Sequence, residues 1–157
     1  MKFLKGFLTL GCIALHTVAC ATVPVQINPA QATLAIQEGD YDVEKRNSDY
    51  CSDITLAWDV QRLQLGEVVV FLNVNGAPIV EENQYEQGCT FTTQAKTENG
   101  VLTQVENEKC PAFEVTNISQ VAPGPKGRVL FTKTTTEVKG PSTRPVQNIK
   151  CQFKPAR

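Results

Sequence analysis

Four cysteines beyond the first 21 residues constrain this chain more than any other feature of its sequence. They stand at positions 51, 89, 110 and 151, an even number once Cys12 and Cys20 are left aside. No two of them have the short spacing of a zinc knuckle, and the one histidine, His16, lies in the first 21 residues. We therefore expect two disulfides and an oxidising compartment.

The first 21 residues have the pattern of an export signal. Lys2 and Lys5 precede an apolar stretch without an acidic residue, which ends in Ala19-Cys20-Ala21. The stretch is shorter than the roughly 20 residues that a membrane-spanning helix needs. We expect a signal peptide over residues 1–21, cleavage after Ala21, and a periplasmic or secreted mature protein. The alternative is a lipobox at residues 17–20, in which Cys20 is lipidated and anchors the protein to an envelope membrane.

The rest of the chain has the length of one domain. Residues 22–37 are uncharged, and Asn28-Pro29 has the form of a helix start, so we expect an N-terminal arm or short helix there. Residues 38–157 are then one disulfide-stapled β domain. The signal contains two of the 15 basic residues and none of the 16 acidic ones, so the mature net charge is near −3. This mild acidity indicates no nucleic-acid partner, and membrane contact is expected only through lipidation of Cys20.

Short alternating segments predict an all-β fold. Residues 54–60 and 149–153 alternate between apolar and polar side chains, the period of a strand with one buried face. Residues 68–72 are a continuous apolar run, and residues 128–138 are rich in threonine; both are typical of strands. Proline and glycine at residues 122–127 interrupt helices and central strands. No segment shows sustained helical periodicity.

Asn99-Gly100 predicts a β-hairpin and, through it, a disulfide. This dipeptide favours a two-residue type I′ turn, in which residues whose numbers sum to 199 face each other. Cys89 then faces Cys110 on a non-hydrogen-bonded rung, where Cα atoms lie about 4.5 Å apart and a disulfide can form. We predict Cys89–Cys110 and, from the remaining pair, Cys51–Cys151. A bulge in the hairpin would shift this register and favour other pairings.

These features predict a single antiparallel up-and-down β-barrel of about eight strands with a short N-terminal helical turn. A β-sandwich is the alternative. A bond between Cys51 and Cys151 would bring the last strand beside the first. The lysines of residues 150–154 would then approach the acidic side chains of residues 40–44, an arrangement that favours a sheet closed on itself.

Over residues 29–154 the chain resembles the lipocalin and calycin group of small exported barrels. In that family a helical turn closes the barrel floor, a Gly-x-Trp motif opens the first strand, and a disulfide often ties in the C-terminal part. Residues 29–36, Gly39-Asp40-Tyr41 and Cys151 stand at the corresponding places. Tyr41 replaces the tryptophan, and no arginine in the last strand matches the one that packs over that ring. The resemblance implies a calycin-like barrel.

Catalysis by histidine is excluded once the signal is removed, because the mature chain contains no histidine. The acidic pairs at positions 40 and 42, 49 and 53, and 81 and 82 are interpreted as solvated strand and loop charges rather than acid–base pairs. We expect no enzymatic activity, no catalytic residue, no metal site and no cofactor.

Two non-enzymatic functions fit this sequence. In the first, Trp58, Phe71, Phe91 and Phe131 line a cavity that holds a small apolar or amphipathic ligand, although ordinary core packing is an alternative role for these rings. In the second, the protein contacts another protein, as an inhibitor or envelope accessory factor, through the loops at residues 75–88 or 121–127. We expect a monomer in both cases.

Overall fold

The computed structural model describes residues 34–59, 62–72, 78–82, 88–141 and 145–157. These residues form an all-β, antiparallel sheet of ten strands and one short 3₁₀ turn, η1 (Pro125–Gly127). The predicted signal segment with Cys20 and Ala21, and most of the predicted N-terminal arm, lie outside the described residues. No helix in the described part of the chain is long and apolar enough to cross a membrane.

The strands follow an up-and-down order with one break. They are β1 (Gly39–Arg46), β2 (Ile54–Trp58), β3 (Arg62–Leu65), β4 (Val68–Phe71), β5 (Ile79–Glu82), β6 (Thr90–Glu98), β7 (Val101–Lys109), β8 (Glu114–Pro123), β9 (Val129–Lys139) and β10 (Asn148–Pro155). Strands that are consecutive in the chain pair with each other, except β4 and β5, and β1 pairs with β10. The edges of the sheet are β4 and β5, and no pairing of described residues joins them.

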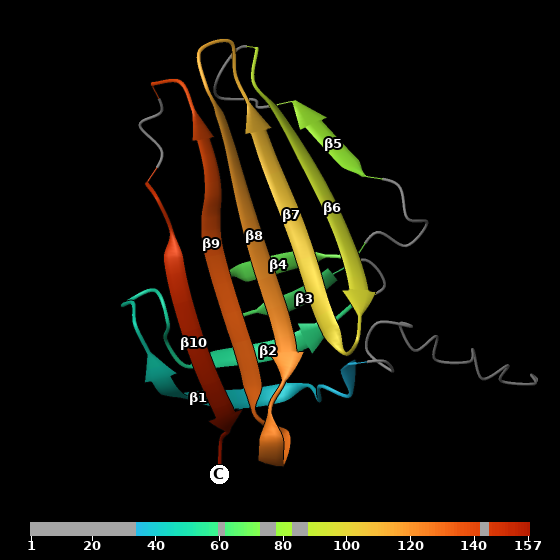
Figure 1. Cartoon of the computed structure of the whole chain (residues 1–157). Coiled ribbons are helices and arrows are strands. Elements are labelled where there is room, and N and C mark those ends of the chain that lie inside the picture. The colour runs from blue at the N-terminus through green and yellow to red at the C-terminus, as the bar shows by residue number, and fades with distance from the viewer. Residues whose placement is uncertain (1–33, 60–61, 73–77, 83–87, 142–144) are drawn as a thin grey trace, which may run out of the picture.

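The sheet curls into a half-barrel. The long strands β6 to β10 form one curved wall, and β1 to β4 cross behind its lower half (Figure 1). Each strand is hydrogen-bonded to the next in the order β4-β3-β2-β1-β10-β9-β8-β7-β6-β5. The strands therefore belong to one sheet and not to the two sheets of a sandwich. The described residues form ten strands, where the sequence predicted about eight. One reason is a turn at Gly66, which adopts φ +61° and folds residues 62–71 into two strands of four residues each.

The β6–β7 hairpin has the predicted register along its whole length. Asn99 and Gly100 adopt φ 51° and 73°, as a type I′ turn requires. Facing residues keep the sum of 199 from Glu98↔Val101 to Thr90↔Lys109, without a bulge. Cys89 and Cys110 form a disulfide across this hairpin, with their Cα atoms 4.1 Å apart.

The second disulfide joins the two ends of the domain. It links Cys51, in the loop after β1, to Cys151 on β10, with Cα atoms 5.7 Å apart. The first and last strands lie side by side, as predicted, and Asp42 faces Lys154 with 3.6 Å between Oδ2 and Nζ. Both disulfides therefore pair the cysteines that the hairpin register indicates.

One apolar core fills the space between the curved wall and the crossing strands. Its members come from both layers and from the segment before β1, where Leu34 and Ile36 are buried. The buried residues of this core are Leu34, Ile36, Tyr41, Cys51, Leu56, Leu63, Leu65, Val70, Leu72, Leu102, Val121, Val129, Phe131, Ile149, Cys151 and Phe153. The alternation predicted for the last strand is confirmed, because Ile149, Cys151 and Phe153 point inward.

Glu44 lies at a bulge in β1 and contacts Arg128 and the β10 residue Gln152. The pairing of β1 with β10 shifts between Val43 and Lys45. Arg128 donates two hydrogen bonds to the Glu44 carboxylate, from Nε to Oε2 at 2.7 Å and from Nη2 to Oε1 at 2.6 Å, and Gln152 donates another. The hydrogen bond from Arg128 is the main reason why the pKa of Glu44 falls from 4.5 to about 2.

This depressed pKa makes a testable contribution to acid stability. Because Glu44 loses its proton more readily in the folded state, its stabilising effect is complete above about pH 4.5 and is lost as the pH falls toward 2. Urea denaturation should therefore show wild type more stable than Glu44→Gln at neutral pH, with the difference shrinking between these two values. Glu98→Gln, on the exposed hairpin end, is the control. A wild-type advantage that persisted unchanged at pH 2 would contradict the assignment.

Candidate ligand-binding pocket

A pocket of about 300 Å³ opens between the β1–β2 loop and the inner face of β9 and β10. Phe131 and Phe153 lie in it, with only 2% and 3% of their surfaces exposed. The volume lies at the lower end of the range of small-molecule sites. The other lining residues are Asp49, Tyr50, Ser52, Ile54, Leu65, Glu67, Val68 and Cys151.

Strand alternation explains the apolar interior of this pocket. Cys151 faces Phe131 across the β9–β10 ladder, and Phe153 follows two residues later on the same face. On the opposite side, the turn at Gly66 places Leu65 directly across from Val68. Side chains two residues apart share a face of a strand, so both walls present apolar groups to the same space.

The loop at the mouth of the pocket is fixed to β10. Asn47 donates from Nδ2 to the Asn148 carbonyl at 2.9 Å, and its Oδ1 accepts the N–H of Lys150 at 2.6 Å. The Cys51–Cys151 disulfide adds a covalent attachment four residues further along the loop. Asp49, Tyr50 and Ser52 are therefore carried by a segment with two attachments to the pocket wall.

The mouth of the pocket is acidic. Asp49 and Glu67 are exposed there, and none of the described residues that line the pocket is basic. Arg46 approaches Asp49 at 3.9 Å, but both side chains are largely in solvent, where such a pair is weak. Glu67 forms no ion pair within the part of the chain that the structure describes.

The four aromatic residues singled out from the sequence occupy different places. Phe131 lies in the pocket, as well as in the core. Trp58 packs at the margin of the core and donates its indole N–H to the Ile36 carbonyl at 3.1 Å. Phe91 is half-buried on β6, across from Glu108. The side chain of Phe71 lies outside the described part of the structure.

The inner face of the long strands becomes polar away from the core, which the sequence reasoning missed. Gln104 on β7 and Ser119 on β8 are each only 1% exposed. Lys133 on β9 reaches across β8 to Glu106 on β7, with Nζ 2.8 Å from Oε2, and Gln104 donates to the same carboxylate at 3.0 Å. The alternation of side chains along a strand could have revealed this zone. If Cys110 faces inward, every second residue before it on β7 faces inward as well.

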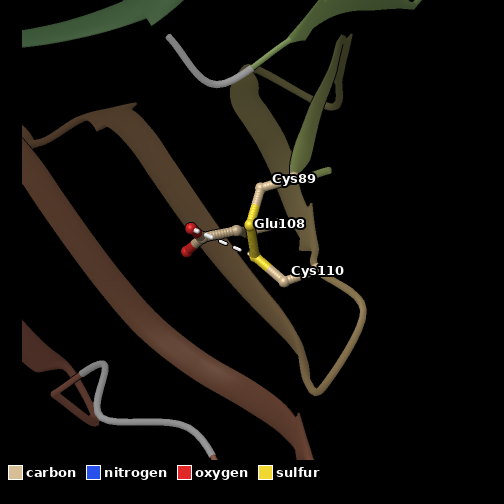
Figure 2. A group of neighbouring side chains, drawn as sticks. All are labelled: Cys89, Glu108 and Cys110. Atoms are coloured by element: carbon tan, nitrogen blue, oxygen red, sulfur yellow. Dashed lines mark hydrogen bonds between the residues drawn. A yellow bond between two sulfur atoms is a disulfide. The ribbon is translucent and has the colours of Figure 1, made fainter. Parts of the chain in front are cut away.

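Glu108 extends this polar zone to the hairpin disulfide. Its carboxylate Oε1 lies 4.0 Å from Sγ of Cys110. The side chains of Glu108, Cys110 and Cys89 are all buried (Figure 2). The carboxylate and the two sulfurs lie within 4.8 Å of one another, a spacing compatible with metal binding. Metals bind cysteine as a thiolate, however, and both sulfurs are held in the disulfide. We therefore do not place a metal site there.

Two of the acidic residues considered for acid–base chemistry, Asp40 and Asp53, accept hydrogen bonds from neighbouring segments. Asp40 Oδ1 accepts a hydrogen bond from the Thr55 hydroxyl at 2.7 Å, between β1 and β2. Asp53 Oδ1 accepts the backbone N–H of Val43 at 2.8 Å. The side chains of Glu81 and Glu82 lie outside the described residues.

A second cavity, of about 530 Å³, borders one of the loops proposed for protein contact. It lies between residues 35–41, the segment 123–128 and the last residues of the chain. Lys126 and Gly127 adopt φ 59° and 72° there, and the Gly124 N–H donates to the Arg128 carbonyl at 2.7 Å, so the loop closes on itself. Most of the other proposed loop, residues 75–88, lies outside the described part of the chain.

The fold and its crosslinks indicate the environment of the protein. Two disulfides are typical of an oxidising, extracytoplasmic compartment. The curled antiparallel sheet is compatible with a barrel architecture. Comparisons with protein-family models, with curated proteins and with solved structures found no match for this chain.

Proposed function

We propose that this chain is an exported, non-enzymatic binding protein that holds a small apolar or amphipathic ligand. The observation that carries the proposal is the pocket of about 300 Å³, which combines buried aromatic and aliphatic side chains with a polar mouth. Pockets that bind small molecules have this composition, with polar groups that orient the ligand and apolar ones that supply most of the affinity. The attachment of the mouth to β10 favours binding, because a loop that is already held in place loses little conformational entropy when the ligand enters.

The proposal includes the processing and shape of the mature protein. The signal peptide of residues 1–21 is removed after Ala21, or Cys20 is lipidated and tethers the domain to an envelope membrane. The mature chain is a monomer in the periplasm or outside the cell. Its half-barrel belongs to a calycin-like barrel, a resemblance supported by the up-and-down strand order and by Gly39 at the start of β1.

Titration of the mature chain, residues 22–157, with 1-octanol tests the proposal. Val68 lines the pocket, so Val68→Trp should fill the space and weaken octanol binding at least about tenfold in calorimetry. Val80→Trp is the matched control, because Val80 is 65% exposed on β5, outside the residues that line the pocket. Equal octanol binding by wild type and Val68→Trp would overturn the proposal, as would a wild type that binds neither octanol nor charged amphiphiles of the same chain length.

The second cavity favours protein contact as the other candidate function. Pro125, Lys126 and Gly127 are exposed beside it, on a loop closed by a backbone hydrogen bond. A partner bound there should be lost on Lys126→Glu, while octanol binding stays unchanged. Affinity capture from the native envelope with wild type and Lys126→Glu as paired baits separates this function from ligand carriage. A partner retained equally by both baits would argue against this loop.

A further inference from the structure

We infer that the ligand of this pocket is a cation: a small amphipathic amine or quaternary ammonium compound. Its apolar part lies against Phe131 and Phe153, and its charged end lies at the mouth beside Asp49 and Glu67. The inference rests on the proposed function and adds to it the charge and size of the ligand.

The interior of the pocket indicates that the ligand has an apolar part and limits how large the ligand can be. The deep residues are apolar, and Phe131, Phe153 and Leu65 are almost completely buried. A charge placed among them would lose its hydration without a partner, which is strongly unfavourable. The space of about 300 Å³ lies at the lower end of the range of small-molecule sites. A small ligand therefore fits, with its polar end directed outward.

The side chains at the mouth of the pocket indicate the sign of the ligand's charge. Asp49 and Glu67 come from two different loops, which both open onto the pocket. None of the described lining residues is basic, and within the part of the chain that the structure describes Asp49 forms an ion pair only with Arg46, at 3.9 Å. An anionic head group such as a carboxylate would meet two like charges, whereas an ammonium group would be attracted by both.

Three probes with the same alkyl chain separate the charge from the apolar contact. Octylammonium, 1-octanol and octanoate should be titrated into the mature chain at neutral pH and low ionic strength. We expect octylammonium to bind about fivefold or more tightly than octanol, and octanoate to bind most weakly. Raising the salt to about 0.5 M should reduce these differences, because exposed charges are then screened.

Charge-neutral variants identify the carboxylates responsible. Glu67→Gln and Asp49→Asn should each weaken octylammonium binding about two- to fivefold and leave octanol binding unchanged. Glu98→Gln removes the same charge at the end of the β6–β7 hairpin and should change neither. Equal affinity for all three probes, or tightest binding of octanoate, overturns the inference while the proposed function stands. If none of the three probes binds, the proposed function itself is wrong.

Discussion

Replacing Cys51 and Cys151 together by alanine is expected to lower the free energy of unfolding by about 4.7 kcal/mol. The crosslink spans a sequence separation of 100 residues, and in the chain-entropy model a loop of that length restricts the unfolded chain by about this amount. Both cysteines are also buried in the core, so their loss removes packing as well. Urea denaturation under non-reducing conditions measures the change.

The hairpin disulfide provides the comparison for this experiment. Cys89 and Cys110 are separated by 21 residues, and a loop of that size corresponds to about 3 kcal/mol in the same model. Removing Cys89 and Cys110 as a pair should therefore cost less than removing Cys51 and Cys151. If the hairpin variant were the less stable of the two, the long-range disulfide would not be the principal crosslink of the fold.

Phe131→Ala is expected to destabilise the protein by about 3–5 kcal/mol, the usual cost of truncating a buried aromatic residue. Phe131 lies near the start of β9, facing Val121 on β8 and Cys151 on β10. Its ring contributes both to the core and to the pocket. Deleting it leaves a cavity at the place where the two layers meet. The change is measured as a shift of the urea denaturation midpoint.

Leu130, the residue before Phe131, is a matched control because its side chain lies on the opposite face of β9. Leu130 precedes Phe131 on β9 but points to the outer surface, where it is 37% exposed. Leu130→Ala should change stability by about 0.5 kcal/mol or less. Phe131→Leu, which keeps an apolar side chain, should lie between the two. A loss from Leu130→Ala as large as that from Phe131→Ala would mean that the faces of β9 have been assigned wrongly.

Much of the fold could be predicted because it depends on local geometry. Asn99-Gly100 specifies a turn whose register extends over the whole hairpin, and that register pairs Cys89 with Cys110. The remaining cysteines then place the first strand beside the last. The expected approach of the C-terminal lysines to the acidic residues 40–44 agrees with this order, because Lys154 lies across from Asp42. These features required only sequence separations and strand alternation.

The pocket could not be predicted, because it depends on how the two layers cross. Its residues come from the β1–β2 loop, the Gly66 turn and the last two strands, whose relative placement is set by the curl of the sheet. The aromatic pattern identified Phe131 but not its neighbour Phe153. The buried polar zone on β7 and β8 was missed for another reason: glutamine, glutamate and serine on a strand suggest an exposed face until the register is fixed.

The positions of the two sheet edges have a consequence for how this chain can be rearranged. Both edges, β4 and β5, belong to the middle of the sequence, whereas the first and last strands are hydrogen-bonded partners inside the sheet. The backbone of Ala156 even donates to the Asp40 carbonyl at 2.9 Å. A circularly permuted chain that begins at β5 and ends at β4 would keep every strand ladder, with its new termini at the edges. In such a chain far fewer residues would separate Cys51 from Cys151 than the 100 of the natural order.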